Sequence, residues 1–131
     1  MKHLKINNKT SLYFSISSNP GSSGSKLHNS FFKLKKKNAI YLPLKIRNLK
    51  NFIQFAKDTN VKGFSVSMPF KQKIIKYLDF KDPNVKKILS CNTVLNKNGK
   101  FSGYNTDYLA TLDILKSVIK IKKSKVLILG N

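Results

Sequence analysis

Short β-prone segments alternate with amphipathic segments between residues 11 and 107, and this alternation limits the chain to one class of fold. Apolar and β-branched side chains predict strands at 11–16, 40–46, 62–68, 91–95 and 100–104. Apolar side chains at helical spacing predict helices near 25–37, 49–60, 74–78, 82–89 and 107–119. Strands that alternate with helices indicate an α/β fold around a sheet of roughly five strands.

Two turn signals add detail to this sheet. Asn98-Gly99 separates the last two of these strands and predicts a tight hairpin, because both turn positions of such a hairpin need positive φ. Pro43 cannot donate a ladder hydrogen bond, so we expect its strand at a sheet edge or at a bulge.

Residues 125–129 form a last predicted strand, with aliphatic residues in an unbroken run. Such a run is typical of a strand buried on both faces of a parallel sheet. Two interpretations are open: the strand completes the first sheet, or it begins a second domain. A strand followed by glycine, here Gly130, is also how a dinucleotide-binding fold begins.

The chain is strongly basic, with 26 lysine and arginine residues, 5 acidic residues and a net charge of +21. This charge favours nucleic acid, because cations neutralise phosphates and release counterions. However, only Arg47 is an arginine, and arginine is the residue that base readout and bidentate phosphate contacts favour. Since lysines lie along nearly every segment, we interpret them as a solvated surface that attracts small anions, and we expect no nucleic-acid partner.

Composition excludes several further classes of protein. A length of 131 residues fits one domain. No apolar run approaches the roughly 20 residues of a membrane-spanning helix, and the first residues show no apolar signal core. Cys91 is the only cysteine and the two histidines lie far apart, so we expect neither a disulfide nor a metal site. A reducing cytoplasm fits these features.

Three segments carry a family pattern. They read Gly-Phe-Ser-Val-Ser-Met-Pro-Phe-Lys at 63–71, Ser-Cys-Asn-Thr-Val-Leu-Asn at 90–96 and Gly-Tyr-Asn-Thr-Asp at 103–107. In order and spacing they resemble the shikimate dehydrogenase family, which carries Asn-Val-Thr-x-Pro-x-Lys, then Val-Asn-Thr, then Gly-Tyr-Asn-Thr-Asp. The resemblance covers about residues 11–131.

The chain also departs from the common pattern of this family. Ser65 and Ser67 stand where the family usually has asparagine and threonine, and residues 19–29 differ from the usual first loop. These departures resemble a divergent, shikimate dehydrogenase-like branch. They leave shikimate, quinate and related polyol acids open as substrates.

The resemblance implies the substrate-binding half of a two-domain oxidoreductase. A three-layer α/β domain with a mostly parallel mixed sheet would occupy residues 1–107, followed by a connecting helix at 108–124 and the first strand of an incomplete NADP-binding domain at 125–131. Gly130 would begin the cofactor motif, and the choice between NADP and NAD stays open, because the discriminating residue follows the second strand of such a domain.

The implied reaction is the NADP-dependent reduction of 3-dehydroshikimate to shikimate in aromatic amino-acid biosynthesis. The resemblance gives the catalytic roles to Lys71 and Asp107. A lysine on a rigid strand end can donate the proton that an alkoxide needs after hydride addition, and a nearby carboxylate holds that lysine in place. The residues expected to hold the substrate through hydroxyl and amide groups are Ser23, Ser25, Ser67, Asn92 and Thr106.

Some of these residues also have a structural interpretation. Ser23 or Ser25 is expected to cap the helix after the first strand, and Thr106 or Asp107 the helix near 107–119.

Two other functions stay open at this point. The chain is a metabolite-binding domain without catalysis, or it is a small basic protein that binds nucleic acid. As a half-enzyme, the isolated chain is expected not to turn over, and its oligomeric state is not predicted.

Overall fold

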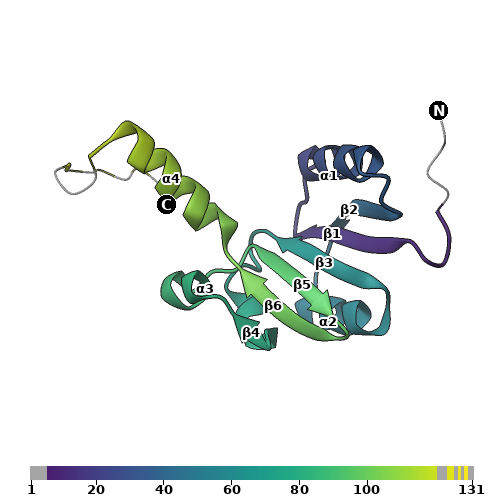
Figure 1. Cartoon of the computed structure of the whole chain (residues 1–131). Helices are drawn as coiled ribbons and strands as arrows, with labels where there is room; N and C mark the ends of the chain where they lie inside the picture. The colour runs from purple at the N-terminus through teal and green to yellow at the C-terminus, as the bar shows by residue number, and fades with distance from the viewer. Residues whose placement is uncertain (1–5, 121–123, 126, 128, 130–131) are drawn as a thin grey trace.

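A six-stranded sheet organises the computed structural model, which describes residues 6–120, 124, 125, 127 and 129 (Figure 1). The elements in chain order are β1 (Ser11–Ser17), α1 (Ser23–Leu34), β2 (Ala39–Lys45), α2 (Leu49–Asp58), β3 (Val61–Val66), the 3-10 helix η1 (Lys73–Tyr77), β4 (Phe80–Lys81), α3 (Pro83–Ile88), β5 (Thr93–Lys97), β6 (Lys100–Tyr104) and α4 (Thr106–Val118). This order confirms the predicted α/β fold.

The strands lie in the order β2-β1-β3-β5-β6-β4. β2, β1 and β3 run parallel, β5 is antiparallel to β3 and to β6, and β4 pairs parallel with β6. The prediction of a mostly parallel mixed sheet is confirmed. Pro43 lies in the edge strand β2, as predicted. Its missing N–H therefore interrupts no hydrogen bond between central strands.

Helices α1 and α2 cover opposite faces of the sheet. Neighbouring residues of a strand point to opposite faces. On β1, the Tyr13 ring contacts Phe32 of α1 at 5.2 Å between centroids, and the Phe14 ring contacts Phe52 of α2 at 6.1 Å. The result is a layer of helix, a layer of sheet and a second layer of helix (Figure 1).

The main core lies between the sheet and α2. The α2 residues Leu49, Phe52, Ile53 and Ala56 recur at helical spacing and are all buried. Phe64 of β3 packs edge-on against Phe52, at 4.9 Å between ring centroids. By contrast, α1 has no fully buried residue, so α2 contributes the larger share of the core.

The hairpin between β5 and β6 forms as predicted. Lys97 pairs with Lys100, and Asn98 and Gly99 between them have φ of 55° and 81°. Both values lie in the left-handed region that this two-residue turn requires.

Two elements differ from the sequence prediction. Residues 74–78 were expected in an α-helix, but residues 73–77 form the 3-10 helix η1, because short helical pieces favour the tighter i→i+3 pattern. Strand β4 was not predicted, since two residues are too few to show an alternating pattern.

The strand predicted at 125–129 stays a prediction. Val126 and Ile128 lie outside the described residues, as does Gly130. Lys125, Leu127 and Leu129 are described and belong to no strand, and the two leucines are 82% and 86% exposed.

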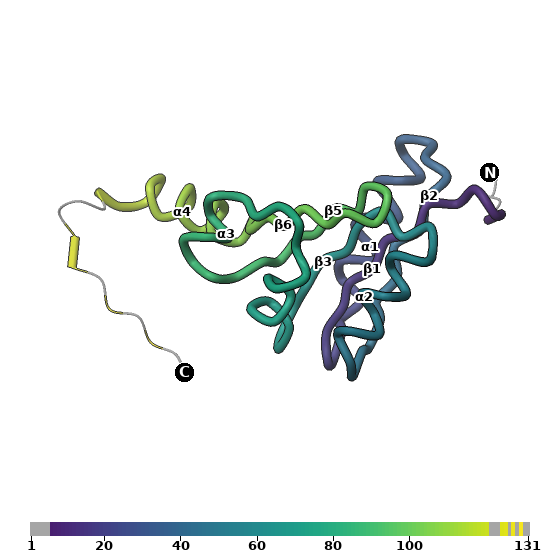
Figure 2. The backbone as a smooth tube through the Cα atoms, turned by 90° about the horizontal axis from the view of Figure 1, so that it is seen from below, coloured from purple at the N-terminus to yellow at the C-terminus, as the bar shows by residue number. Residues whose placement is uncertain are grey.

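Helix α4 leads away from the sheet in both views (Figures 1 and 2). It buries no residue fully. Within the described part of the chain, no helix is long and apolar enough to cross a membrane.

The close packing of β3 against β5 predicts the effect of one substitution. A Cβ atom on the buried Gly63 would lie 2.9 Å from the backbone oxygen of Val94, which cannot move without displacing β5. We expect Gly63→Ala to lower the free energy of unfolding in urea by about 1–3 kcal/mol. The matched control is Gly21→Ala, since nothing lies within 4 Å of a Cβ at Gly21. Equal stabilities of the two variants would contradict the close approach.

Candidate active site

The register of three strands brings three segments to one edge of the sheet. β3 ends at Val66, and β5 starts beside it, because Ser65 pairs with Thr93. β6 ends at the same place, since Tyr104 also pairs with Thr93. The residues after β3, before β5 and after β6 therefore lie together, and they are the segments in which the sequence motifs were found.

The loop of residues 67–71 is held by backbone hydrogen bonds on both sides. The N–H of Ser67 donates to the carbonyl of Ile16 at 2.9 Å. The N–H of Cys91 donates to the carbonyl of Lys71 at 2.9 Å. These bonds fix the Lys71 backbone between the end of β1 and the start of β5.

Two further features shape this loop, a cis peptide bond and a buried aromatic side chain. The Met68–Pro69 peptide bond is cis. Phe70 is 5% exposed and belongs to the core. The apolar anchor at Phe70 places the next residue, Lys71, at the rim of the core.

Asn105 fixes the start of α4. Its side chain is buried; the Oδ1 atom accepts from the N–H of Tyr108 at 2.9 Å, and the Nδ2 atom donates to the carbonyl of Ser90 at 2.9 Å. The prediction that Thr106 or Asp107 caps this helix is therefore wrong, because the cap lies one residue earlier. Asp107 instead stands in the first turn of α4.

Asn92 ties the start of β5 to the start of α4. Its Nδ2 atom donates to the Thr106 hydroxyl oxygen at 2.9 Å, and its Oδ1 atom accepts from the Thr106 N–H at 3.0 Å. The Thr93 hydroxyl donates to the same oxygen at 3.0 Å. The Asn92 oxygen thus accepts from two protein donors, and its amide nitrogen donates to Thr106 and to the Asp107 carboxylate.

Lys71 and Asp107 meet as an ion pair, as the two motifs together predict. The Lys71 Nζ atom donates to the Asp107 Oδ2 atom at 2.6 Å. The side chains are 29% and 57% exposed, so the pair is partly shielded and still open to a small molecule.

The environment of Asp107 favours its charged form. The hydrogen bond from Lys71 lowers the pKa of the Asp107 carboxyl below its usual value, and partial burial opposes this. A hydrogen bond from the Asn92 side chain and the positive charge of Lys71 lower the pKa further.

In the described part of the chain, none of the predicted serine residues hydrogen-bonds to Lys71 or Asp107. Ser67 is exposed on the loop that carries Lys71. Ser23 is exposed at the start of α1, and the Ser25 hydroxyl donates to the carbonyl of Ser22 at 2.7 Å. The prediction that Ser23 or Ser25 caps α1 is wrong: α1 already begins at Ser23, and Ser22 takes the cap position without a side-chain hydrogen bond to the helix. Their role in substrate binding stays a prediction.

Sequence reasoning missed one polar pair beside the motif of β3. The Ser65 Oγ atom lies 2.5 Å from the Tyr41 hydroxyl oxygen. His28 of α1 stacks on the Tyr41 ring at 4.4 Å between centroids, and Asn29 makes two hydrogen bonds to the Tyr41 backbone. No local pattern could reveal this pair, because its members belong to different strands.

Cys91 is a fully buried residue, and burial raises the pKa of its thiol. The described residues contain no group of three or more His, Cys, Asp or Glu side chains placed to hold a metal ion.

Three comparisons with known proteins bear on this geometry. Residues 20–94 match the shikimate dehydrogenase substrate binding domain. The chain is 32% identical over 126 residues to a shikimate dehydrogenase-like protein of Haemophilus influenzae, covering 96% of this chain and 46% of that protein. It is 38% identical over 128 residues to the shikimate dehydrogenase (NADP(+)) of Pyrococcus furiosus, covering 95% and 47%.

The fold is also that of a solved relative. A shikimate 5-dehydrogenase from Listeria monocytogenes, crystallised with shikimate and NAD, superposes with a TM-score of 0.79 at 31% identity. The match covers 86% of this chain and 40% of that one. The chain thus spans about half the length of the curated relatives it matches.

The Lys71–Asp107 contact predicts a measurable titration. The carboxyl carbon of Asp107, followed by NMR, is expected to titrate below the usual aspartate pKa of about 3.9. In Lys71→Met the midpoint should rise, because the first cause of the lowering is removed. Since the folded pKa is the lower one, the pair stabilises the fold above about pH 4 and loses that effect as the pH falls through the folded value. A midpoint that Lys71→Met leaves unchanged would contradict the contact.

Proposed function

This chain belongs to the shikimate dehydrogenase family, and from that premise we propose that it binds shikimate and 3-dehydroshikimate at the Lys71–Asp107 pair. In this proposal the chain is the substrate-binding half of an NADP-dependent reductase. The observation that carries the proposal is the 2.6 Å contact between two residues that stand 36 positions apart, each in its own family motif.

Lys71 is suited to move the proton of the reaction. When a carbonyl is reduced, its oxygen gains negative charge and takes up a proton. An ammonium group has three N–H donors, and Asp107 accepts one of those of Lys71. The other two can hydrogen-bond the reacting oxygen and donate to it. In the reverse direction, the neutral amine accepts the proton from the substrate hydroxyl.

Asp107 keeps this amine in position. Its carboxylate sits in the first turn of α4, whose start Asn105 and Asn92 hold by side-chain hydrogen bonds. The low pKa of the Asp107 carboxyl keeps it charged at neutral pH, so that it orients the Lys71 ammonium throughout the working range.

The remaining predicted residues would bind the substrate's hydroxyl and carboxylate groups. Thr106 accepts a hydrogen bond from Asn92 and can donate its own hydroxyl hydrogen to a ring oxygen. The Ser67 hydroxyl lies on the loop of Lys71 and can do the same. Ser23 and Ser25 stand at the start of α1, where hydroxyl groups and helix N–H groups together favour a carboxylate.

NADPH, when bound, supplies the hydride, and the described residues do not fit this cofactor. Between residues 6 and 120 no glycine-rich turn joins a strand to a helix with the spacing that a dinucleotide needs. Gly130, where such a motif was expected to begin, lies outside the described residues. The chain's own residues therefore contribute substrate binding and proton transfer. The place in aromatic amino-acid biosynthesis, the cytoplasmic location and the lack of a nucleic-acid partner stay predictions.

Binding of shikimate to the 131-residue chain is the first test. We expect saturable binding by calorimetry without oxidation of NADPH, and a loss of affinity of about tenfold or more in Lys71→Met, because a hydrogen bond from a charged group is removed. The matched control is Lys116→Met on the exposed part of α4, which removes the same charge elsewhere. Equal affinities of the two variants would remove Lys71 from the binding site.

Steady-state kinetics of a fusion protein test the proposed proton transfer by Lys71. The chain would be fused after α4 to the cofactor-binding half of the Pyrococcus furiosus relative. Once the fusion with the unchanged chain reduces 3-dehydroshikimate, we expect Lys71→Ala to lower kcat by about 10²–10⁴-fold with a smaller change in KM. Lys116→Ala serves as the control. An unchanged kcat in Lys71→Ala would refute the catalytic role.

A further inference from the structure

A cavity lies between the start of α2 and η1, apart from the Lys71–Asp107 pair. Its volume is about 470 Å³, and its lining residues include neither Lys71 nor Asp107. Small-molecule sites typically measure roughly 300–1,000 Å³, so the cavity is large enough for a metabolite. The proposed reaction does not use it.

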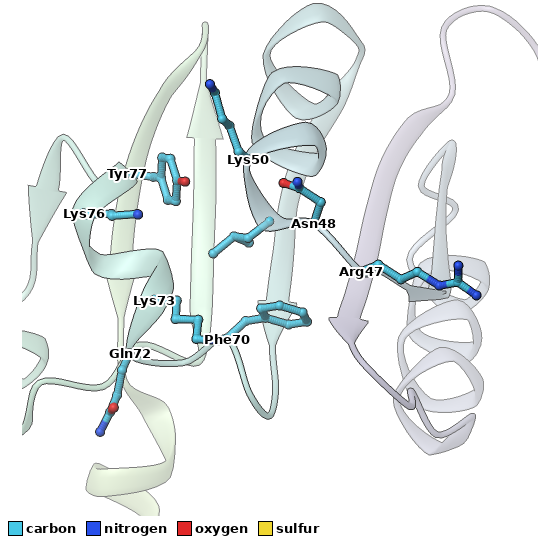
Figure 3. A pocket seen from close by; sticks show the side chains of 9 residues that line it. Arg47, Asn48, Lys50, Phe70, Gln72, Lys73, Lys76 and Tyr77 are labelled. Carbon is cyan, nitrogen blue, oxygen red and sulfur yellow. The ribbon is translucent and has the colours of Figure 1, made fainter.

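Lysines from two separate elements line this cavity. Lys73 and Lys76 come from η1, and Lys50 comes from the first turn of α2 on the opposite wall (Figure 3). Arg47 also belongs to the lining, but in Figure 3 its guanidinium and the Lys50 ammonium both point away from Lys73 and Lys76. No acidic side chain lines the cavity, so nothing in its wall balances this charge.

The rest of the wall suits a small organic anion. Leu49 and Phe70 are buried and give the cavity an apolar floor. The Tyr77 hydroxyl points from η1 toward the start of α2 (Figure 3). The Asn48 Oδ1 atom accepts from the Asn51 N–H at 3.2 Å, so the Asn48 Nδ2 atom can donate to a ligand beside the lysines and Tyr77.

We propose that this cavity binds a small phosphate-bearing metabolite, with the phosphate held by Lys73 and Lys76. Like charges on neighbouring side chains repel one another, and a dianion bound between them attracts each lysine and offsets this repulsion. Lysine binds phosphate as a point charge with three donors, and Lys73 and Lys76 stand three residues apart on η1, one turn of a 3-10 helix, so both can donate to one phosphate group. The apolar floor at Leu49 and Phe70 would contact the carbon part of the ligand.

Anion binding in this cavity can be distinguished from the general attraction of anions to a basic surface. Lysines lie along nearly every segment of the chain, and each of them attracts anions weakly through solvent. A built site differs because its lysines act on one ligand together. Removing two of them must therefore weaken binding far more than removing two lysines elsewhere.

The test is a titration of the 131-residue chain with inorganic phosphate at constant ionic strength, followed by NMR of the backbone amides. We expect saturable binding with one phosphate, and amide shifts centred on residues 48–50 and 72–77. The double variant Lys73→Ala/Lys76→Ala should weaken binding by about tenfold or more. The matched control, Lys35→Ala/Lys36→Ala, removes the same charge from exposed residues after α1 and should change the affinity less than twofold.

Several outcomes would overturn the proposal. These are no saturable binding, equal weakening in both double variants, or loss of binding in Lys71→Met, which would place the phosphate at the ion pair. Because Lys73 and Lys76 are exposed, their replacement should leave the fold intact, which circular dichroism checks. Addition of shikimate separates this proposal from the proposed reaction: it should not displace phosphate, and phosphate binding should persist even if shikimate does not bind.

Discussion

The antiparallel register between β3 and β5 is the constraint on which the candidate site depends. It places the end of β3 beside the start of β5, and β6 then returns to the same edge through a two-residue turn. Gly63 permits the close approach, since a side chain there would meet the Val94 carbonyl. A slip by one residue would turn every side chain of β5 to the other face and separate the segments that bear Lys71 and Asp107.

Two asparagine side chains hold together the segments that the strands bring to this edge of the sheet. Asn92 and Asn105 are buried, and their amide groups bond to the backbone or side chains of neighbouring segments. Within the described part of the chain, no buried side-chain nitrogen or oxygen atom lacks a hydrogen-bond partner. The site is therefore preorganised before any ligand arrives, which is the condition under which a lysine can transfer a proton efficiently.

Features that rest on local chemistry could be predicted from the sequence. Asn98-Gly99 specifies its hairpin through φ, and Pro43 specifies an edge through its missing donor. Features that depend on contacts across the fold could not be predicted. The cap at Asn105 depends on its bond to Ser90, the two bonds of Asn92 depend on α4, and the pair of Ser65 and Tyr41 joins separate strands. The cavity at Lys50, Lys73 and Lys76 belongs to this second group, because α2 and η1 meet only in the folded chain.

A crystal structure of the chain with shikimate tests most directly whether the Lys71–Asp107 pair is the site of substrate binding. We predict a ring hydroxyl oxygen of shikimate within about 3.2 Å of the Lys71 Nζ atom, with the ion pair retained. Shikimate bound elsewhere on the chain, without contact to Lys71 or Asp107, would contradict the proposed function.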